Sequence, residues 1–324
     1  MTTTTNDPNA TISIENVSKH YRDQTALDGL SLKVPEGAVF GLLGENGAGK
    51  TTTLSILLGL IRADGGAVRV LGLDPERDGL AIRRRVGYVP EQPALYDWMT
   101  VAEAGWFAAG FHPEPVTGTG AYQIRYAELT QGFGLPPNRK IKALSKGMRA
   151  KVSLSLALAS APRLLILDEP TSGLDTMVRR EFLESMVDLA ANGQTVLLSS
   201  HQIAEVERVA SHVALLHQGK LILSEPLDDL RAHTFSLAVN FQSRDHDPAP
   251  PSGLAMELID AADAPRQARW LVRARDRAAC EAVRALPGVE SLQIESPSLE
   301  DVYIGYMRGR RPEPTSRVGS AHVA

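Results

Sequence analysis

Residues 38–54 read AVFGLLGENGAGKTTTL, and this stretch decides the fold. The apolar run from Ala38 to Leu43 predicts a buried strand, the residues GENGAGKT follow at once, and a helix is predicted to open at Lys50. A strand, a glycine-rich loop with the spacing G-x-x-x-x-G-K-T and a helix together form the pattern of a phosphate-binding loop, the Walker A motif. A chance glycine-rich turn would not be expected to have both flanking elements.

The residue types of this loop suit a bound phosphate. Glycines lack a Cβ, so they let the backbone turn sharply and approach a ligand closely. The free N–H groups at the start of a helix, together with the helix dipole, favour an anion. Lys50 can reach the terminal phosphates of a nucleotide, and the Thr51 hydroxyl can bind a magnesium ion that bridges them. The candidate nucleotide-binding residues of the loop are Gly44, Glu45, Asn46, Gly47, Ala48, Gly49, Lys50, Thr51 and Thr52.

Length and composition narrow the class of protein. A chain of 324 residues, 43% of them hydrophobic, predicts about two domains with substantial cores. The net charge of −4 gives no reason to expect non-specific binding to nucleic acid. The single cysteine, Cys280, excludes an internal disulfide and fits a reducing compartment. Residues 1–10 lack an apolar signal core, and no stretch approaches the roughly 18 apolar residues of a membrane span, so we expect a soluble chain with a disordered N-terminal tail.

Around the loop the chain alternates predicted strands and helices. Residues 11–17 and 30–34 alternate apolar and polar side chains, as half-buried strands do. Thr100 and Glu103 have the spacing of a capping box, and the aromatic-rich region around them predicts an inserted helical subdomain at about 91–162. Further strands are predicted at 67–71, 86–89, 164–167 and 195–199, a helix at 182–191, and a hairpin around Gln218-Gly219.

The character of the sequence changes near Leu230, which predicts a second, smaller domain at 233–308. Short strand patterns, a helix pattern and a Ser298 placed to cap a final helix indicate an α/β domain. Residues 309–324 are predicted to be disordered.

A second motif with phosphate chemistry follows the predicted strand at 164–167. The apolar residues suit a buried strand, and Asp168 at its end can hold a magnesium ion through water. Glu169, the next residue, can face an attacking water and act as general base or orient that water. An ordinary strand followed by an acidic turn is the alternative. The Walker A motif in the same α/β unit favours the catalytic interpretation, the Walker B motif.

Several motifs in a fixed order make the sequence resemble the nucleotide-binding subunit of ABC transporters over about residues 12–232. The Walker A residues GENGAGKTT precede a signature-like LSKGM at 144–148, Walker B residues LLILDEP at 164–170, a D-loop-like SGLD at 172–175, and His201 at the switch position. The helical insertion before the signature also matches the family's layout. The resemblance implies an α/β P-loop NTPase of ABC type with an inserted helical subdomain and a small C-terminal α/β accessory domain.

The resemblance assigns roles to residues outside the two Walker motifs. Tyr21 matches the aromatic residue that stacks on adenine, although it could be an ordinary strand-edge tyrosine. Ser145 and Gly147 match signature positions that contact the γ-phosphate bound by a partner subunit, and Asp175 matches the aspartate that crosses the dimer interface. His201 matches the residue that contacts the γ-phosphate and positions the water, with a helix-capping histidine as the alternative.

Two departures from the family pattern concern the same chemistry. Lys146 and Met148 stand where glycine and glutamine are usual, and Lys146 is either a surface residue or an added charge beside the partner's phosphate. The glutamine that senses magnesium and the membrane partner aligns with Glu91, while Gln92 stands next to it. We therefore rank Glu91 first and Gln92 second as magnesium ligands, beside Thr51 and Asp168.

These observations predict an ATP-binding and ATP-hydrolysing subunit of an ABC transporter, with ATP and Mg²⁺ as its ligands. Two cassettes, as a homodimer or a mixed pair, would sandwich the nucleotides head to tail and drive a separate membrane permease through residues 91–135. The protein would be cytoplasmic and peripheral on the inner face of the membrane, without a nucleic-acid partner. Family members that export drugs, antibiotics or sodium share the altered signature and a C-terminal helix like Ser298-Leu299-Glu300-Asp301, which favours an exporter.

Two alternatives work without a membrane partner. A soluble ABC-type ATPase acting on ribosomes or DNA would be expected to carry tandem cassettes or long coiled coils. An ATP-binding regulator would not need Glu169 and His201. The sequence does not specify the transported substrate.

Overall fold

The computed structural model describes residues 10–112, 120–243 and 253–308. The chain divides into two compact units, Met1–Leu227 and Asp228–Ala324. The tails expected at 1–10 and 309–324 lie outside the described residues, apart from Ala10, which begins a strand. The domain boundary expected at 232–233 falls at the end of the helix α8 (Leu227–His233).

The centre of the first unit is a six-stranded sheet with the order β5-β6-β7-β3-β8-β9. The strands from β5 to β8 are parallel, and β9 closes the edge as an antiparallel hairpin with β8, as expected around Gln218-Gly219. Every residue of β3, β6 and β7 is buried, which explains why their sequences are mostly apolar. The bounds are β3 Val39–Leu43, β5 Val86–Val89, β6 Leu164–Asp168, β7 Thr195–Ser200, β8 His212–His217 and β9 Lys220–Pro226.

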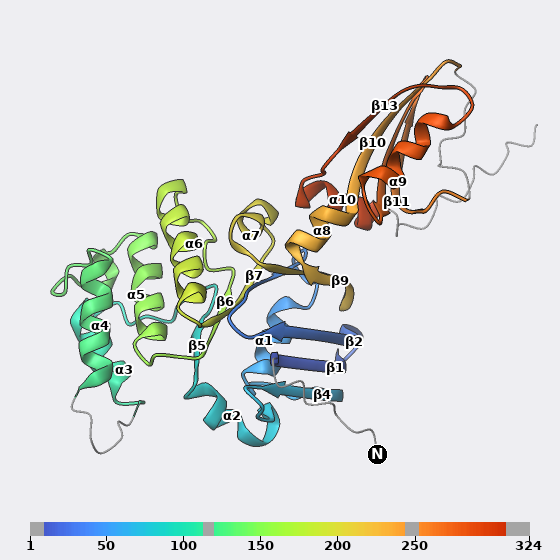
Figure 1. Ribbon diagram of the computed structural model, residues 1–324. Coiled ribbons are helices and arrows are strands. Elements are labelled where there is room, and N and C mark those ends of the chain that lie inside the picture. The colour runs from blue at the N-terminus through green and yellow to red at the C-terminus, as the bar shows by residue number, and fades with distance from the viewer. Residues whose placement is uncertain (1–9, 113–119, 244–252, 309–324) are drawn as a thin grey trace, which may run out of the picture. The chain divides into compact units, whose positions relative to one another are not determined.

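A three-stranded antiparallel sheet, β2-β1-β4, packs on this centre (Figure 1). The strands β1 (Ala10–Tyr21) and β2 (Gln24–Pro35) have twelve residues each, longer than the sequence predicted. Irregular register between them breaks the alternation of apolar and polar residues, so the pattern showed only part of each strand. The third strand is β4 (Gly65–Val70). A core between the two sheets includes the buried side chains of Ile12, Leu30, Phe40 and Leu57.

The inserted helical subdomain consists of α3 (Val101–Ala109), α4 (Ala121–Gly132) and α5 (Lys146–Leu158), with a 3-10 turn at Ile141–Ala143. These helices lie side by side in Figure 1. The capping box of Thr100 and Glu103 is confirmed. The Tyr126 hydroxyl donates to the Val101 carbonyl at 2.8 Å and ties α4 to α3. The subdomain is thus an ordered group with its own core.

The remaining helices of the first unit follow strands of the central sheet. The helix α1 (Lys50–Leu57) follows β3, α6 (Thr176–Ala191) follows β6, and α7 (Ile203–Val209) follows β7. The helix α6 begins before its predicted start at 182, because Asp175 caps it. The helix α2 (Pro75–Arg83) was not predicted, although an Asp74 cap followed by proline is a signal for the start of a helix.

The second unit contains a four-stranded antiparallel sheet with the order β11-β12-β10-β13. One face carries a core around the buried Trp270. Ser298 caps the last helix as predicted, since its hydroxyl accepts from the Asp301 N–H at 3.1 Å. The bounds are β10 Thr234–Phe241, β11 Met256–Ala264, β12 Gln267–Ala274, α9 Arg277–Glu281, a 3-10 turn Ala282–Ala285, β13 Val289–Glu295 and α10 Leu299–Arg308. In the described parts of both units, no helix has the length and apolar character needed to cross a membrane.

Candidate functional site

The glycines of the loop between β3 and α1 are required by its shape. Gly49 has φ +108° and caps α1, and a Cβ on it would lie 2.6 Å from the Ala26 carbonyl oxygen. A Cβ on Gly44 would lie 2.5 Å from the Leu216 carbonyl oxygen. Because neither position has room for a side chain, only glycine lets the loop backbone pack this closely against Ala26 and Leu216.

Lys50 lies across this loop with only 5% of its side chain exposed. Its Nζ donates to the carbonyl oxygens of Gly44 at 2.6 Å and Glu45 at 3.3 Å, and lies 3.2 Å from Glu169 Oε1. All three partners are oxygen atoms. A phosphate oxygen would be a partner of the same kind with more negative charge.

The candidate magnesium ligands Thr51 and Asp168 lie together, as the sequence predicted. Thr51 Oγ1 donates to Asp168 Oδ2 at 3.0 Å, which joins the start of α1 to the end of β6. Ser199 Oγ donates to the other carboxylate oxygen, Oδ1, at 2.5 Å. Ser199 was not predicted as a site residue. The signal was its place at the end of β7, directly opposite Asp168 in the parallel register.

Glu169 is held in an uncommon backbone conformation, with φ +46°. Its N–H donates to the Ser199 carbonyl oxygen at 3.1 Å, and its side chain is nearly buried. Oε2 lies 2.7 Å from His201 Nδ1 and also accepts from the His201 N–H at 3.3 Å. The structure therefore brings Lys50, Glu169 and His201 into one network, with one glutamate oxygen facing each partner.

A cavity of about 330 Å³ opens in front of the loop. Tyr21, at the end of β1, is 46% exposed on its wall. Glu91 lines the cavity, and Gln92 does not belong to its lining, so the geometry favours Glu91 between these two candidates. Gln24 and Ala26 were not predicted, although Gln24 pairs with Tyr21 across the hairpin. The lining residues are Tyr21, Gln24, Ala26, Glu45, Asn46, Gly47, Gly49, Lys50, Thr51, Thr52, Glu91 and Glu169.

The candidate signature and D-loop residues form a separate cluster where α5 and α6 begin. Ser145 caps α5 and accepts from the Met148 N–H at 3.2 Å, while Asp175 caps α6 and accepts from the Val178 N–H at 3.0 Å. Gly147 packs so closely that a Cβ on it would lie 2.9 Å from a Val178 methyl carbon. As far as the described residues show, none of this cluster lines the cavity.

Lys146 extends along this cluster rather than away from it. Its Nζ lies 2.2 Å from the position that a Cβ on Gly173 would occupy, so the ammonium rests on the glycine of the segment 172–175. Gly173 has φ +66°, which also disfavours a larger residue there.

Comparison with known proteins agrees with this arrangement. The ABC transporter family model matches residues 27–172. Daunorubicin resistance ATP-binding protein DrrA2 of Streptomyces coeruleorubidus is 33% identical over 331 residues, which cover 94% of this chain and 97% of that protein. The chain belongs to the ABC transporter family. An uncharacterised ABC transporter ATP-binding protein of Nostoc sp. is 40% identical over 224 residues, covering 68% of this chain and 65% of that protein.

Solved structures of ABC cassettes show the same fold. One, described as the structure of an ATP-binding subunit of an ABC transporter, is 32% identical, has a TM-score of 0.62, and covers 68% of this chain and 91% of that chain. Another, a dimeric cassette in a post-hydrolysis state bound to ADP and Pi, is 25% identical with a TM-score of 0.60, and covers 67% of this chain and 98% of that chain. The predicted ABC-type P-loop fold and the family assignment are confirmed, and this ABC chain is an ATP-binding, ATP-hydrolysing subunit.

Proposed function

We propose that this ABC subunit hydrolyses ATP in the cavity between β1 and the Walker A loop, and that hydrolysis drives a separate exporter permease. The observation that carries the proposal is the network of Lys50, Glu169 and His201, in which Lys50 and Glu169 line that cavity. It combines a cation for phosphate with a carboxylate that can take a proton. Phosphate release from ATP by the purified full chain tests this activity directly.

The residues divide the hydrolytic step between them. Lys50 binds the β- and γ-phosphate oxygens, and Tyr21 stacks on the base at the far wall. Glu169 accepts the proton of a water whose oxygen forms a bond to the γ-phosphorus while the bond to the ADP oxygen breaks. His201 holds the Glu169 carboxylate through Nδ1 and presents its other ring nitrogen toward the γ-phosphate.

Magnesium fits the oxygen atoms at the loop. Among the described residues, no group of three or more His, Cys, Asp or Glu side chains could hold a metal alone. Mg²⁺ is usually held by one or two carboxylates together with substrate phosphates, which matches Asp168, the Thr51 hydroxyl and Glu91. When bound, the ion neutralises phosphate charge.

Replacing Thr51 by Val should remove most of the magnesium-dependent gain in nucleotide affinity. The valine keeps the shape of the side chain but lacks the hydroxyl ligand. We expect ADP affinity in magnesium to fall about tenfold, with no change in EDTA. Calorimetry under both conditions measures this, and an unchanged magnesium effect would remove Thr51 from the ligand set.

The signature and D-loop cluster lies apart from the cavity within one chain, which supports a paired arrangement. In the proposed head-to-tail dimer, Ser145 and Gly147 of one cassette meet the γ-phosphate held by the other, and Asp175 crosses the interface. Both Ser145 and Asp175 already mark helix starts, whose N–H groups suit an anion or a partner's polar groups.

Replacing Ser145 by Arg should therefore block ATP-dependent dimerisation, because the long side chain would fill the contact between cassettes. The dimer fraction in ATP can be measured in a Glu169→Gln background, which suspends hydrolysis. Lys142→Arg, on the exposed turn before the signature, is the matched control and should dimerise like its parent. Normal dimerisation of Ser145→Arg would contradict the head-to-tail model.

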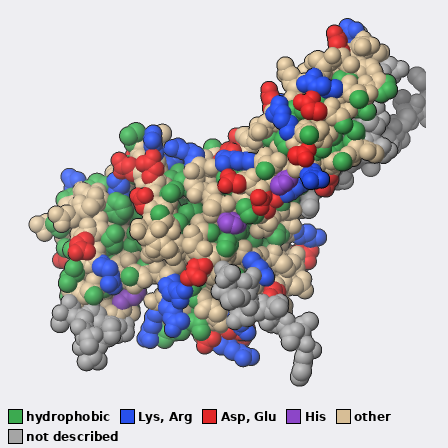
Figure 2. All heavy atoms as spheres, viewed as in Figure 1, with side chains coloured by type: hydrophobic (Ala, Val, Ile, Leu, Met, Phe, Trp, Pro, Cys, Tyr) green, Lys and Arg blue, Asp and Glu red, His purple; other side chains and the backbone are tan. Residues whose placement is uncertain are grey.

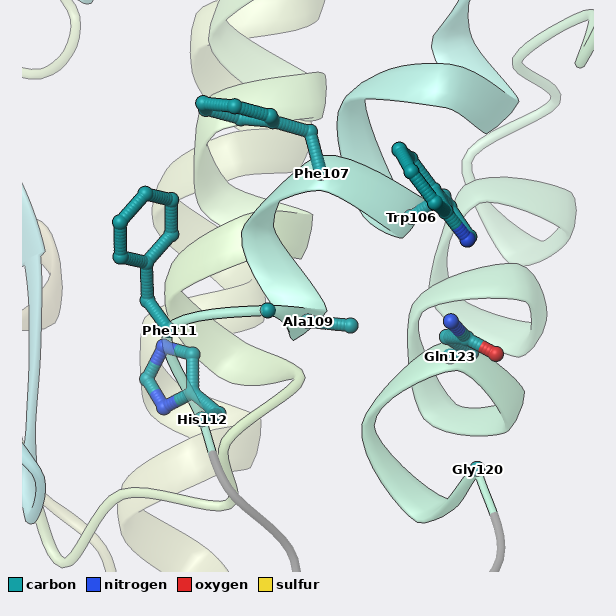
Figure 3. A pocket seen from close by; sticks show the side chains of 8 residues that line it. Trp106, Phe107, Ala109, Phe111, His112, Gly120 and Gln123 are labelled. Carbon is teal, nitrogen blue, oxygen red and sulfur yellow. The ribbon is translucent and has the colours of Figure 1, made fainter.

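The helical subdomain offers the surface for a permease. Trp98, Trp106 and Phe111 are each at least 64% exposed, and the Phe107 and Phe111 rings meet edge to face at 5.3 Å. Figure 3 shows Trp106 and Gln123 beside one hollow, with the Phe107 and Phe111 rings on its other side. Exposed aromatic groups are typical of protein contacts. We place the coupling contact here, which would hold the protein at the inner face of the membrane, in the cytoplasm.

The surface charge gives no support to a nucleic-acid partner. Figure 2 shows acidic and basic side chains interspersed on the face in view. The net charge is −4. A nucleic-acid surface needs clustered positive charge.

The names of relatives such as the daunorubicin resistance protein support an exporter.

A further inference from the structure

A buried carboxylate that the proposed chemistry does not use lies behind the catalytic network. Glu205, in the first turn of α7, is 6% exposed. Its Oε2 accepts a hydrogen bond from the Thr171 hydroxyl, and its Oε1 lies 3.1 Å from Arg179 Nε. An ionised carboxylate is costly to bury unless its oxygens find partners. Here Oε2 accepts a hydrogen bond, and Oε1 has an ion-pair contact that is not a hydrogen bond.

The two partners come from the chain just after the Walker B strand. Thr171 follows Glu169 with only Pro170 between them, and the proline ring fixes one backbone angle of this short connection. Arg179 lies near the start of α6, and its Nη2 donates to the Leu174 carbonyl oxygen at 3.1 Å. Glu205 thus contacts the residue that follows Glu169-Pro170 directly, and it contacts the D-loop-like segment through Arg179.

Glu205 follows His201 in the chain, with His201 just before α7 and Glu205 in the first turn of that helix. The helix α7 covers only Ile203–Val209, and a helix this short depends on tertiary contacts for its position. Besides the bonds of Ser199 to Asp168 and Glu169, two further side-chain contacts join the segments at the ends of β6 and β7: His201 to Glu169 at 2.7 Å, and Glu205 to Thr171. The second contact is buried, while the His201 side chain is 45% exposed.

We propose that Glu205 is a positioning residue for hydrolysis: by anchoring α7 to Thr171 and Arg179, its carboxylate holds the His201 imidazole against Glu169. The inference rests on the proposed roles of Glu169 and His201. A rotation of α7 would break both Glu205 contacts at once. The buried carboxylate therefore holds residues 201–209 in one orientation. Small displacements of positioning groups lower the rate of turnover strongly, so a contact that fixes His201 would raise kcat.

The Thr171 hydroxyl gives the cleanest test, because valine has nearly the same shape. Thr171→Val should lower kcat about tenfold and leave the KM and Kd for ATP within about twofold, since Lys50 and its loop are untouched. Thr171→Ser keeps the hydroxyl and should restore kcat. Thr130→Val is the matched control: this buried threonine of the helical subdomain also loses a hydroxyl hydrogen bond, to Tyr126, and should leave kcat unchanged.

A double mutant separates positioning from general loss of stability. In a His201→Ala background, Thr171→Val should cause no further loss of kcat, because its effect passes through His201. Two results would overturn the proposal. One is a wild-type kcat in a folded Thr171→Val variant, and the other is a decrease in kcat by the same factor in the wild-type and His201→Ala backgrounds. If the unmodified chain releases no phosphate, the proposed function fails instead. Hydrogen exchange of residues 201–209 then still tests whether the contact between Glu205 and Thr171 holds α7 in place. Protection of these amides from exchange should fall in Thr171→Val and not in Thr130→Val.

Discussion

Replacement of Glu169 by Gln is expected to abolish nearly all ATP turnover while ATP still binds. The glutamine keeps the size of the side chain but cannot accept the proton of the attacking water, a loss of about 100-fold or more. Binding should be maintained or strengthened, because Lys50 Nζ no longer pairs with a charged Oε1 at 3.2 Å. Phosphate release measures the first effect and calorimetry with ATP the second.

The control for this change is Glu300→Gln, on the exposed first turn of α10. It makes the same chemical substitution at a residue of the second unit that is not among those lining the cavity, and it should leave both measurements at their wild-type values. Turnover of Glu169→Gln within about twofold of the wild type would rule out Glu169 as the base, since the expected loss is far larger.

Replacement of Lys50 by Ala is expected to have the largest effect on binding. Hydrogen bonds to a charged group contribute about 1.5–3 kcal/mol, so the loss of the ammonium should lower ATP affinity by about tenfold to 100-fold. The same change leaves the buried Glu169 without its cation, and breaking a buried pair costs about 3–5 kcal/mol before relaxation. A lower melting temperature should therefore accompany the weaker binding.

Two measurements keep these effects apart. Thermal unfolding establishes how much of the Lys50→Ala chain is folded, and calorimetry is then performed at a temperature where it is fully folded. Lys142→Ala removes an exposed lysine near the signature and should change neither quantity. A folded Lys50→Ala chain that binds ATP as tightly as the wild type would show that the loop does not hold the phosphates.

The sequence by itself determined the phosphate-binding unit. Its strand, loop and helix are contiguous in residues 38–57, and the positive φ of Gly49 at the start of the helix is a local backbone requirement that glycine meets. The caps at Thr100 and Ser298 were equally local, since each joins a residue to one three positions later. The apolar run before Asp168 and the mostly apolar residues 195–199 also predicted buried strands, which the structure confirms.

Only the tertiary structure decided how the ends of these strands meet. Ser199 reaches Asp168 because β7 lies between β6 and β3, an order that no local pattern contains. The buried contact of Thr171 with Glu205 likewise joins residues 34 positions apart. That Glu91 lines the cavity while Gln92 does not also depended on the placement of the chain in space. Hydrogen bonds between distant segments depend on strand order and register, and these are fixed by packing of the whole core rather than by neighbours in the chain.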